Sequence, residues 1–182
     1  ASNKMFDEVF WFYVSKGATE IDRYVKFNYT ENTWDIGTLR RTAWADSGIH
    51  QYPRGAEESS GNAVIYQHEL GDDNNGTAMT SFVESTDFDI GDGDQFMFIK
   101  RLVPDIAITS SAGNSVDYIL KTRNFPGDSL TTNSTNSVSS TTEQAFIRAR
   151  SRQAVIRVES SSTDISWTLG DLRLDAKPDG RR

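Results

Sequence analysis

The 182-residue chain carries 19 lysines and arginines against 26 aspartates and glutamates, a formal net charge of −7, whereas proteins that bind duplex DNA usually present a basic footprint. It contains no cysteine, which excludes disulfides, thiol catalysis and cysteine-ligated zinc sites. Its 4 tryptophans, 6 tyrosines and 10 phenylalanines supply bulk for a hydrophobic core, so we expect a folded chain. No apolar run approaches the length of a transmembrane helix, and the first residues lack the pattern of a signal peptide.

The first predicted elements are strands, because β-branched and aromatic residues occur in short runs and helical periodicity is nearly absent. Strands are expected at 8–15, 22–29 and 34–39, joined by short connections into an antiparallel meander. The run EVFWFYVS at 8–15 is dense in aromatic residues, which suits a strand that is buried on both faces. Residues 42–61 contain Pro53 and several glycines, so they are predicted to be mostly loop.

The rest of the chain continues the pattern of strands and polar turns. Strands at 62–70 and 77–85 flank a strong turn at 71–76. The Ser/Thr/Asn-rich stretch at 126–142 is predicted to be a surface loop, because its polarity keeps it out of a core. The other strands recur at a spacing typical of an antiparallel β-sandwich. They are expected at 95–106, 116–125, 143–150, 154–161 and 165–178, with a turn at 110–115.

We predict an all-β fold with two domains, because the composition changes along the chain. Residues 1–85 are expected to form partial β-propeller blades with loops, and residues 86–182 an antiparallel β-sandwich. The blade interpretation rests on an aromatic strand, a tight turn after Tyr29, and Trp34 at the start of the next strand. A propeller needs at least about four blades. Further blades are therefore expected N-terminal to Ala1, and the alternative is a single meander that packs on the sandwich.

Four phrases, in order along the chain, resemble the C-terminal part of one protein family. They are RYVKFNYTENTWDIGTLRRTAWADSG, VIYQHELG, SFVESTDFDIGDGDQFMFIKRLVPD and WTLGDLRLDAKPDGRR. The family is the tail nozzle or hub protein of short-tailed bacteriophages (podoviruses), also called tail tubular protein B. The resemblance implies a β-propeller followed by a β-sandwich, assembled as a hexameric ring in the virion tail. It also implies contact with the tail adaptor, passage of double-stranded DNA during ejection, no cofactor and no enzymatic activity.

The phrase STDFDIGDGDQF contains an acidic cluster, made of Asp87, Asp89, Asp92 and Asp94. An EF-hand loop needs aspartate at positions 1, 3 and 5, glycine at 6 and glutamate at 12, and no start in this stretch meets that spacing. A cation site of another type stays open as an alternative, since carboxylates are hard oxygen ligands. We predict a connecting turn at the domain boundary, because aspartate and glycine favour turn conformations.

Two carboxylate groupings have the composition that a glycoside hydrolase needs. They are Glu69 with Asp72 and Asp73, and Glu84 with Asp87. With 26 acidic residues such pairs arise by chance, so we predict no catalytic role for them.

The two histidines are His50, in a predicted loop, and His68, in a predicted strand. The first is expected to be solvated and the second to be a hydrogen-bonded sheet residue, with a two-histidine metal site as the alternative. No Gly-x-Ser-x-Gly elbow is present. No residue is therefore predicted to be catalytic, to bind a cofactor or to ligate a metal.

Arg148, Arg150 and Arg152 are expected to share one face of a strand, where like charges repel unless they meet carboxylates, a partner subunit or phosphate. Three interpretations stay open: a solvated face, an inter-subunit salt-bridge surface, and a contact with DNA that passes through the lumen. The apolar face changes phase at 151–154, which predicts a bulge or tight turn.

The tryptophans Trp11, Trp34, Trp44 and Trp167 are predicted to be mostly core, with Trp44 as a candidate interface anchor beside two arginines. The favoured function is a structural protein of the phage tail. The alternatives are a carbohydrate-binding or carbohydrate-cleaving tail module, and a propeller-type adhesion module unrelated to viruses.

Overall fold

The computed structural model describes residues 1–48, 50–110 and 113–181, and it confirms the all-β fold class. The chain divides into two compact units, Ala1–Gly71 (unit 1) and Asp72–Arg182 (unit 2). The described part of the chain has no helix with the length and apolarity that a bilayer crossing requires. The turn predicted at 110–115 falls partly on residues 111–112, which lie outside the described residues.

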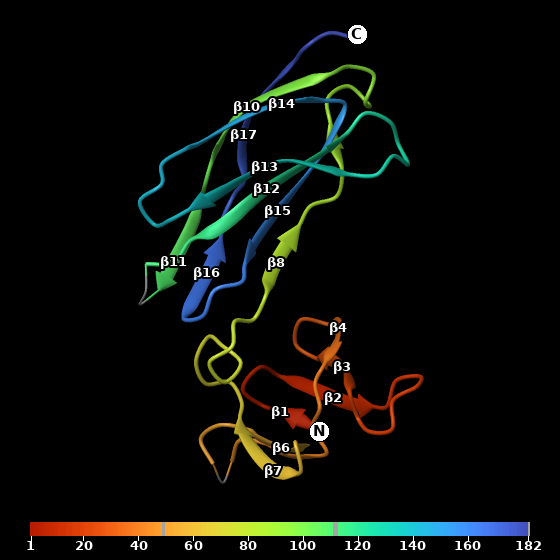
Figure 1. Cartoon of the computed structure of the whole chain (residues 1–182), viewed down its shortest axis with the longest axis vertical. Helices are drawn as coiled ribbons and strands as arrows, with labels where there is room; N and C mark the ends of the chain where they lie inside the picture. The colour runs from red at the N-terminus through yellow and green to blue at the C-terminus, as the bar shows by residue number, and fades with distance from the viewer. Residues whose placement is uncertain (49, 111–112, 182) are drawn as a thin grey trace. The chain divides into compact units, whose positions relative to one another are not determined.

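Unit 1, coloured red to yellow in Figure 1, contains two antiparallel sheets. The first has the strand order β1-β2-β3-β4 and the second the order β5-β6-β7. The strands are β1 (Ser2–Asn3), β2 (Glu8–Tyr13), β3 (Arg23–Asn28), β4 (Thr33–Thr38), β5 (Ala43–Ala45), β6 (Arg54–Ser59) and β7 (Asn62–Gln67).

Most of the described residues in 42–61 lie outside strands, as predicted, but the segment also contains β5 and β6, which the sequence did not predict. Ser60 and Gly61 have φ angles of 53° and 79°, and such left-handed pairs form the two-residue turn that joins hairpin strands. Strand β6 holds a glycine and two glutamates, which are poor strand formers on their own. It forms because it pairs with β5 on one side and β7 on the other.

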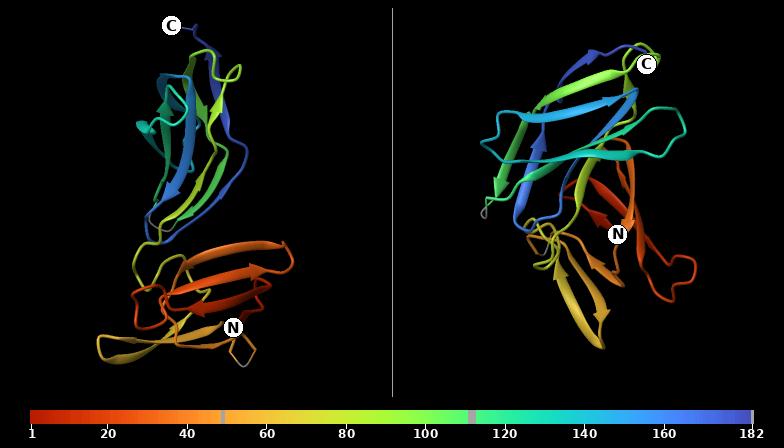
Figure 2. Two further views of the ribbon diagram at one scale, coloured as in Figure 1. Left: turned by 90° about the vertical axis from the view of Figure 1, so that its right-hand side faces the viewer. Right: turned by 45° about the horizontal axis from the view of Figure 1, so that its top comes forward.

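Unit 2 comprises the remaining strands, coloured from yellow-green to blue in Figure 1 and seen from two further directions in Figure 2. Its largest sheet has the order β13-β12-β15-β8, with β9 also paired to β15. A three-stranded sheet has the order β14-β10-β17, and β11 pairs with β16. The strands are β8 (Ser81–Glu84), β9 (Phe88–Asp89), β10 (Met97–Val103), β11 (Ile106–Ser110), β12 (Val116–Arg123), β13 (Thr131–Val138), β14 (Ala145–Ser151), β15 (Gln153–Ser160), β16 (Ile165–Leu169) and β17 (Arg173–Pro178).

One hydrophobic core joins the sheets of unit 2. Alternate residues of β12, namely Val116, Tyr118 and Leu120, are almost fully buried, in line with the strand predicted at 116–125. Strands from the two larger sheets contribute side chains to this core, and β16 adds Ile165. The other members are Met97, Ile99, Leu102, Val138, Ile147, Ala149, Ala154, Ile156 and Val158.

Two predictions were wrong in unit 2. The polar stretch at 126–142 contains β13, which pairs with β12 along its length and buries Val138 opposite Val116. The domain boundary lies at Gly71–Asp72 instead of 85–86, because β8 pairs with β15 and so belongs to the second unit. The tight connection predicted at 151–154 is confirmed, since the single residue Arg152 joins β14 to β15.

Candidate functional site

The side of the sheet β1–β4 that faces the interior of unit 1 carries charged side chains beside aromatic ones such as Phe10. Glu8 is only 9% exposed, and its Oε1 accepts a hydrogen bond of 2.8 Å from Lys26 Nζ. Lys26 Nζ also lies 3.5 Å from Asp35 on the neighbouring strand. The fully buried Asn3 donates a hydrogen bond of 2.9 Å to Glu69. These charges are paired, as charges away from water must be.

A second buried charge, Arg41, is held by three groups of the β5–β7 part of unit 1. Its Nε donates a hydrogen bond of 2.8 Å to His68 Nε2, and its Nη1 donates one of 2.7 Å to Glu57. Its guanidinium carbon lies 4.3 Å from the ring centroid of Tyr66. Burial lowers the pKa of His68 to about 4, and the charge of Arg41 adds to this effect. His68 is therefore a neutral acceptor near pH 7. It is hydrogen-bonded, as predicted, but it lies one residue past the end of β7 (Asn62–Gln67) and not within the strand.

Two glycines make room for this interior. A Cβ on Gly55 would lie 2.6 Å from Arg41 Cδ and 2.9 Å from His68 Nε2. Tyr24 on β3 pairs in register with Gly37 on β4, and a Cβ on Gly37 would lie 2.5 Å from the ring of Tyr24. Both distances are well below van der Waals contact, so a larger residue at either position would have to displace the neighbouring side chain.

Trp44 lies inside unit 1. Its ring centroid is 5.7 Å from that of Phe10, 5.9 Å from that of Phe12 and 4.6 Å from that of His68. Its indole nitrogen donates a hydrogen bond of 2.9 Å to the backbone carbonyl of Ser2. These contacts fit the core interpretation of Trp44, and they occupy the ring that an interface anchor would present.

The opposite side of the sheet β2–β4 is aromatic and exposed. Trp11, Trp34 and Ile36 are 50%, 65% and 70% exposed. Trp34 stacks on Trp11 with 5.8 Å between ring centroids, and it contacts Phe27 in a tilted arrangement with 4.7 Å between centroids. We call this surface the open face. Strand register places on it Val9, Trp11, Tyr13, Val25, Phe27, Trp34 and Ile36, with the polar Arg23 and Thr38 at one end.

Two predictions about the residues of the open face were therefore wrong. Trp11 and Trp34 are not core residues, and β2 is buried on one face only. Their aromatic character predicted burial, but the face that they share has no cover within unit 1.

The three predicted arginines lie at one end of the β14-β10-β17 sheet, and two of them are held within the unit. Arg150 Nε donates a hydrogen bond of 2.6 Å to the carboxylate of Asp179, and its guanidinium carbon lies 4.0 Å from the ring centroid of Phe96. Arg152 donates hydrogen bonds of 3.1 Å to the backbone carbonyls of Gly93 and Asp94.

The third arginine, Arg148, is exposed and forms no ion pair with the residues that the structure describes. Arg148 and Arg150 share the outward face of β14, but Arg152 lies beyond its end, in the connection to β15. The prediction that all three share one strand face is therefore corrected for Arg152.

The aspartate cluster forms a turn, in agreement with the prediction. Gly91, Asp92 and Gly93 have φ angles of 65°, 55° and 75°, three left-handed residues in succession. Asp87 is tied to Arg123 by an ion pair. Within residues 1–48, 50–110 and 113–181, no group of three or more acidic or histidine side chains could hold a metal ion. The turn lies inside unit 2 and does not mark the boundary between the units.

The predicted carboxylate pairs are engaged in other contacts. Glu84 accepts hydrogen bonds from Lys121 and Arg157, and the bond from Lys121 is the largest cause that lowers the pKa of Glu84. A glycosidase general acid needs a raised pKa instead. Glu69 belongs to unit 1 and is bonded to Asn3, whereas its predicted partners Asp72 and Asp73 belong to unit 2. His50 lies in a bend, as expected for a loop residue.

No family model matches the chain, and no curated protein matches it.

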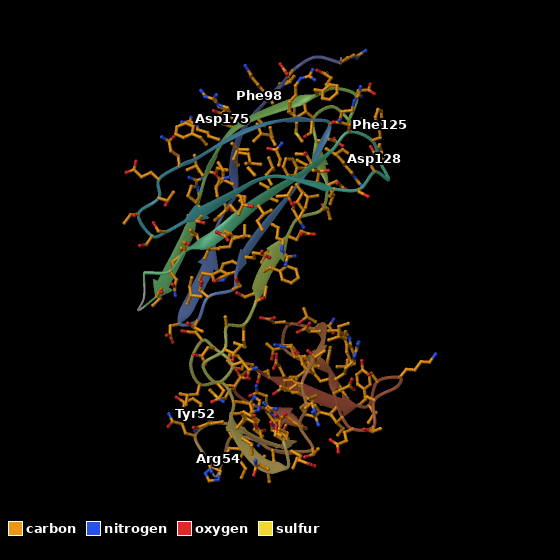
Figure 3. The ribbon with its side chains drawn as sticks, in the orientation of Figure 1. Tyr52, Arg54, Phe98, Phe125, Asp128 and Asp175 are labelled. Carbon is orange, nitrogen blue, oxygen red and sulfur yellow. The ribbon has the colours of Figure 1, made fainter. Side chains whose placement is uncertain are left out.

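The structure adds cationic residues that the sequence did not single out. They lie beside Arg148 and Arg150 on the outward side of the β14-β10-β17 sheet, because each strand of this sheet alternates core and surface residues. Phe98 and Asp175, labelled in Figure 3, belong to this surface. We call it the basic face; it consists of Phe98, Lys100, Arg101, Phe146, Arg148, Arg150, Arg173, Asp175 and Lys177.

Proposed function

We propose that the chain is a structural protein of a bacteriophage tail, a subunit of a nozzle or hub ring that works by packing its sheet faces against neighbours. The observation that carries this proposal is the open face of unit 1. Its three most exposed members, Trp11, Trp34 and Ile36, are aromatic or aliphatic, whereas the interior side of the same sheet carries Glu8 and Lys26. A large apolar patch of this kind marks an interaction site on a soluble protein.

The geometry of the sheet supports a flat β partner. Four antiparallel strands in the order β1-β2-β3-β4 form the kind of sheet from which propeller blades are built. Sheets pack face to face through interdigitating side chains, and the open face offers such side chains on three adjacent strands. The resemblance to the tail nozzle family supports the same assignment and implies a ring that encloses the path of DNA.

The substitution Ile36→Glu tests the proposal, because it places a charge at the most exposed position of the open face. Leu70→Glu is the matched control, since Leu70 is 54% exposed and lies outside the sheet β1–β4. In negative-stain images of the intact protein we expect rings for the wild type and for Leu70→Glu, and single subunits for Ile36→Glu. Absence of rings from the wild-type protein, together with absence of the protein from purified virions, would contradict the proposal.

A second candidate is carbohydrate binding, which the pair Trp11 and Trp34 favours. Their rings are 25° from coplanar and well exposed, and the C–H face of a sugar can pack on such rings. Retention on a bacterial surface polysaccharide that is lost in Trp34→Ala, while the ring still assembles, would favour this function.

A further inference from the structure

The basic face has a charge opposite to that of the chain as a whole. Strands β10, β14 and β17 carry one carboxylate, Asp175, among six cationic side chains. The six are Lys100, Arg101, Arg148, Arg150, Arg173 and Lys177. In a chain of net charge −7, this segregation concentrates positive charge on one sheet surface.

Half of these cations are neutralised within unit 2. Arg101 lies 3.2 Å from Asp175, Arg150 2.6 Å from Asp179, and Arg173 3.8 Å from Asp105. Six cations against three carboxylates leave a surplus of three positive charges on this surface.

The surplus falls on three exposed side chains, Lys100, Arg148 and Lys177. None of them forms an ion pair with a residue of the described ranges 1–48, 50–110 and 113–181. Lys177 Nζ lies 5.7 Å from the ring centroid of Phe98, so the lysine sits beside an aromatic surface. These cations are available to an anionic ligand.

The outer side of the other large sheet of unit 2 shows that this surplus is specific to the basic face. There Lys121 lies 2.6 Å from Glu84, and Arg157 lies 2.5 Å from Glu159. Arg123 pairs with Asp87. Each of these cations has a carboxylate partner, so that side offers no positive surplus.

Aromatic rings alternate with the cations of the basic face. Strand β10 has the order Phe98-Ile-Lys100-Arg, and β14 the order Phe146-Ile-Arg148-Ala-Arg. Phe146 is 65% exposed, and Phe98 pairs in register with Arg150. Phe146 precedes Arg150 by four residues, so the two rings stand about 13 Å apart along the strands.

We propose that the basic face binds single-stranded nucleic acid without sequence preference. Phosphates would lie on Lys100, Arg148 and Lys177, and splayed bases would stack on Phe146 and Phe98. Sheets that bind single strands combine these two contacts, because every base has a π face and every linkage has a charge. No residue of the open face takes part, so this proposal is independent of the ring assembly.

Two other polyanions fit less well. A duplex keeps the faces of its bases inside the stack, so it would use the cations of this surface but leave the rings of Phe146 and Phe98 without a stacking partner. An acidic protein surface would match the cations but would offer no flat rings to Phe146.

The test is fluorescence anisotropy of a labelled short oligothymidylate titrated with the intact protein. For three phosphate contacts we expect the affinity to fall roughly 20-fold between about 50 and 200 mM salt. The triple substitution K100Q/R148Q/K177Q is expected to reduce binding at least about tenfold and to flatten the salt dependence. Phe146→Ala is expected to cost roughly tenfold by removing one stacking platform.

The matched control is K4Q/K16Q/R54Q, which removes the same charge from three exposed cations of unit 1 and should leave binding unchanged. A duplex of equal length and poly-glutamate serve as competitors. Equal displacement by poly-glutamate, combined with no effect of Phe146→Ala, would overturn the proposal in favour of an acidic protein partner. No binding at low salt, or equal losses in both triple variants, would also overturn it.

Discussion

The two units place charge on opposite sides of their largest sheets. In unit 1 the sheet β1–β4 buries the ion pair of Glu8 with Lys26 and exposes Trp34. In unit 2 the strand β12 buries Leu120 and presents Lys121 to the ion pairs of the outer surface. Unit 2 is therefore an ordinary closed fold, whereas the interior of unit 1 combines ring packing of Phe10 and Trp44 with ion pairs, and the outer surface of its sheet has no cover within the described residues of the unit.

This difference separates stability from assembly. A closed apolar core stabilises its own unit, so its side chains should matter most to unfolding. An exposed apolar face contributes little until a partner covers it, so its side chains should matter most to association. Substitutions in the two units test whether stability and association depend on different side chains.

The largest effect is expected for Leu120→Ala in the core of unit 2. Leu120 is 1% exposed, and truncation of such a leucine removes buried area and leaves a cavity. We expect a loss of about 3 kcal/mol in the free energy of unfolding, measured by urea denaturation followed by circular dichroism. A loss below about 1 kcal/mol would show that this core is not closed.

A smaller loss is expected for Gly37→Ala in unit 1. The added Cβ would stand 2.5 Å from the ring of Tyr24, which must then move within the packed interior. We expect about 2 kcal/mol of destabilisation. Tryptophan fluorescence should report mainly on unit 1, because Trp11, Trp34 and Trp44 lie there and only Trp167 lies in unit 2. The penalty should shrink when Tyr24→Ala is present, and an unchanged penalty would point to backbone strain instead.

Acidification should weaken unit 1 through His68. Its pKa is about 4 in the fold, against an ordinary value of 6.5, because burial and Arg41 disfavour the imidazolium. The unfolded chain therefore binds the proton more readily. The stabilisation is complete above pH 6.5 and is lost as the pH falls towards 4. Since His68 is only half buried, we expect about 1 kcal/mol. Thermal unfolding of His68→Gln should lack this part of the pH dependence.

The smallest effect is expected for Ile36→Ser on the open face. Ile36 is 70% exposed, so its truncation should change the free energy of unfolding of the isolated chain by less than about 0.5 kcal/mol. The same substitution should still weaken association in sedimentation-velocity runs. A destabilisation comparable with that of Leu120→Ala would mean that the open face is covered within the chain.

The strands that the sequence predicted well are those in which apolar residues mark their own alternation, such as β3 and β12. The strands β6 and β13 were missed because their residues are polar or small, and it is their pairing with neighbouring strands that makes them part of a sheet. Burial of Trp34 could not be judged from its type alone, since an aromatic residue suits a core and an interface equally.

The candidate surfaces were only partly predictable. Arg148 and Arg150 alternate within one strand, so the sequence showed that they share a face. Lys100 and Lys177 come from strands far away in the chain, and a register shift next to Lys100 sets its place. Only the pairing of β10 with both β14 and β17 shows that these charges lie together.

The connection from β14 to β15 has a mechanical consequence. A single residue, Arg152, leaves no slack between two strands that belong to different sheets. Its guanidinium also ties the carbonyls of Gly93, Asp94 and Arg181 to this corner. A force that shears one sheet past the other must first break the hydrogen bonds of Arg152. Unit 2 should therefore resist stretching as one rigid block.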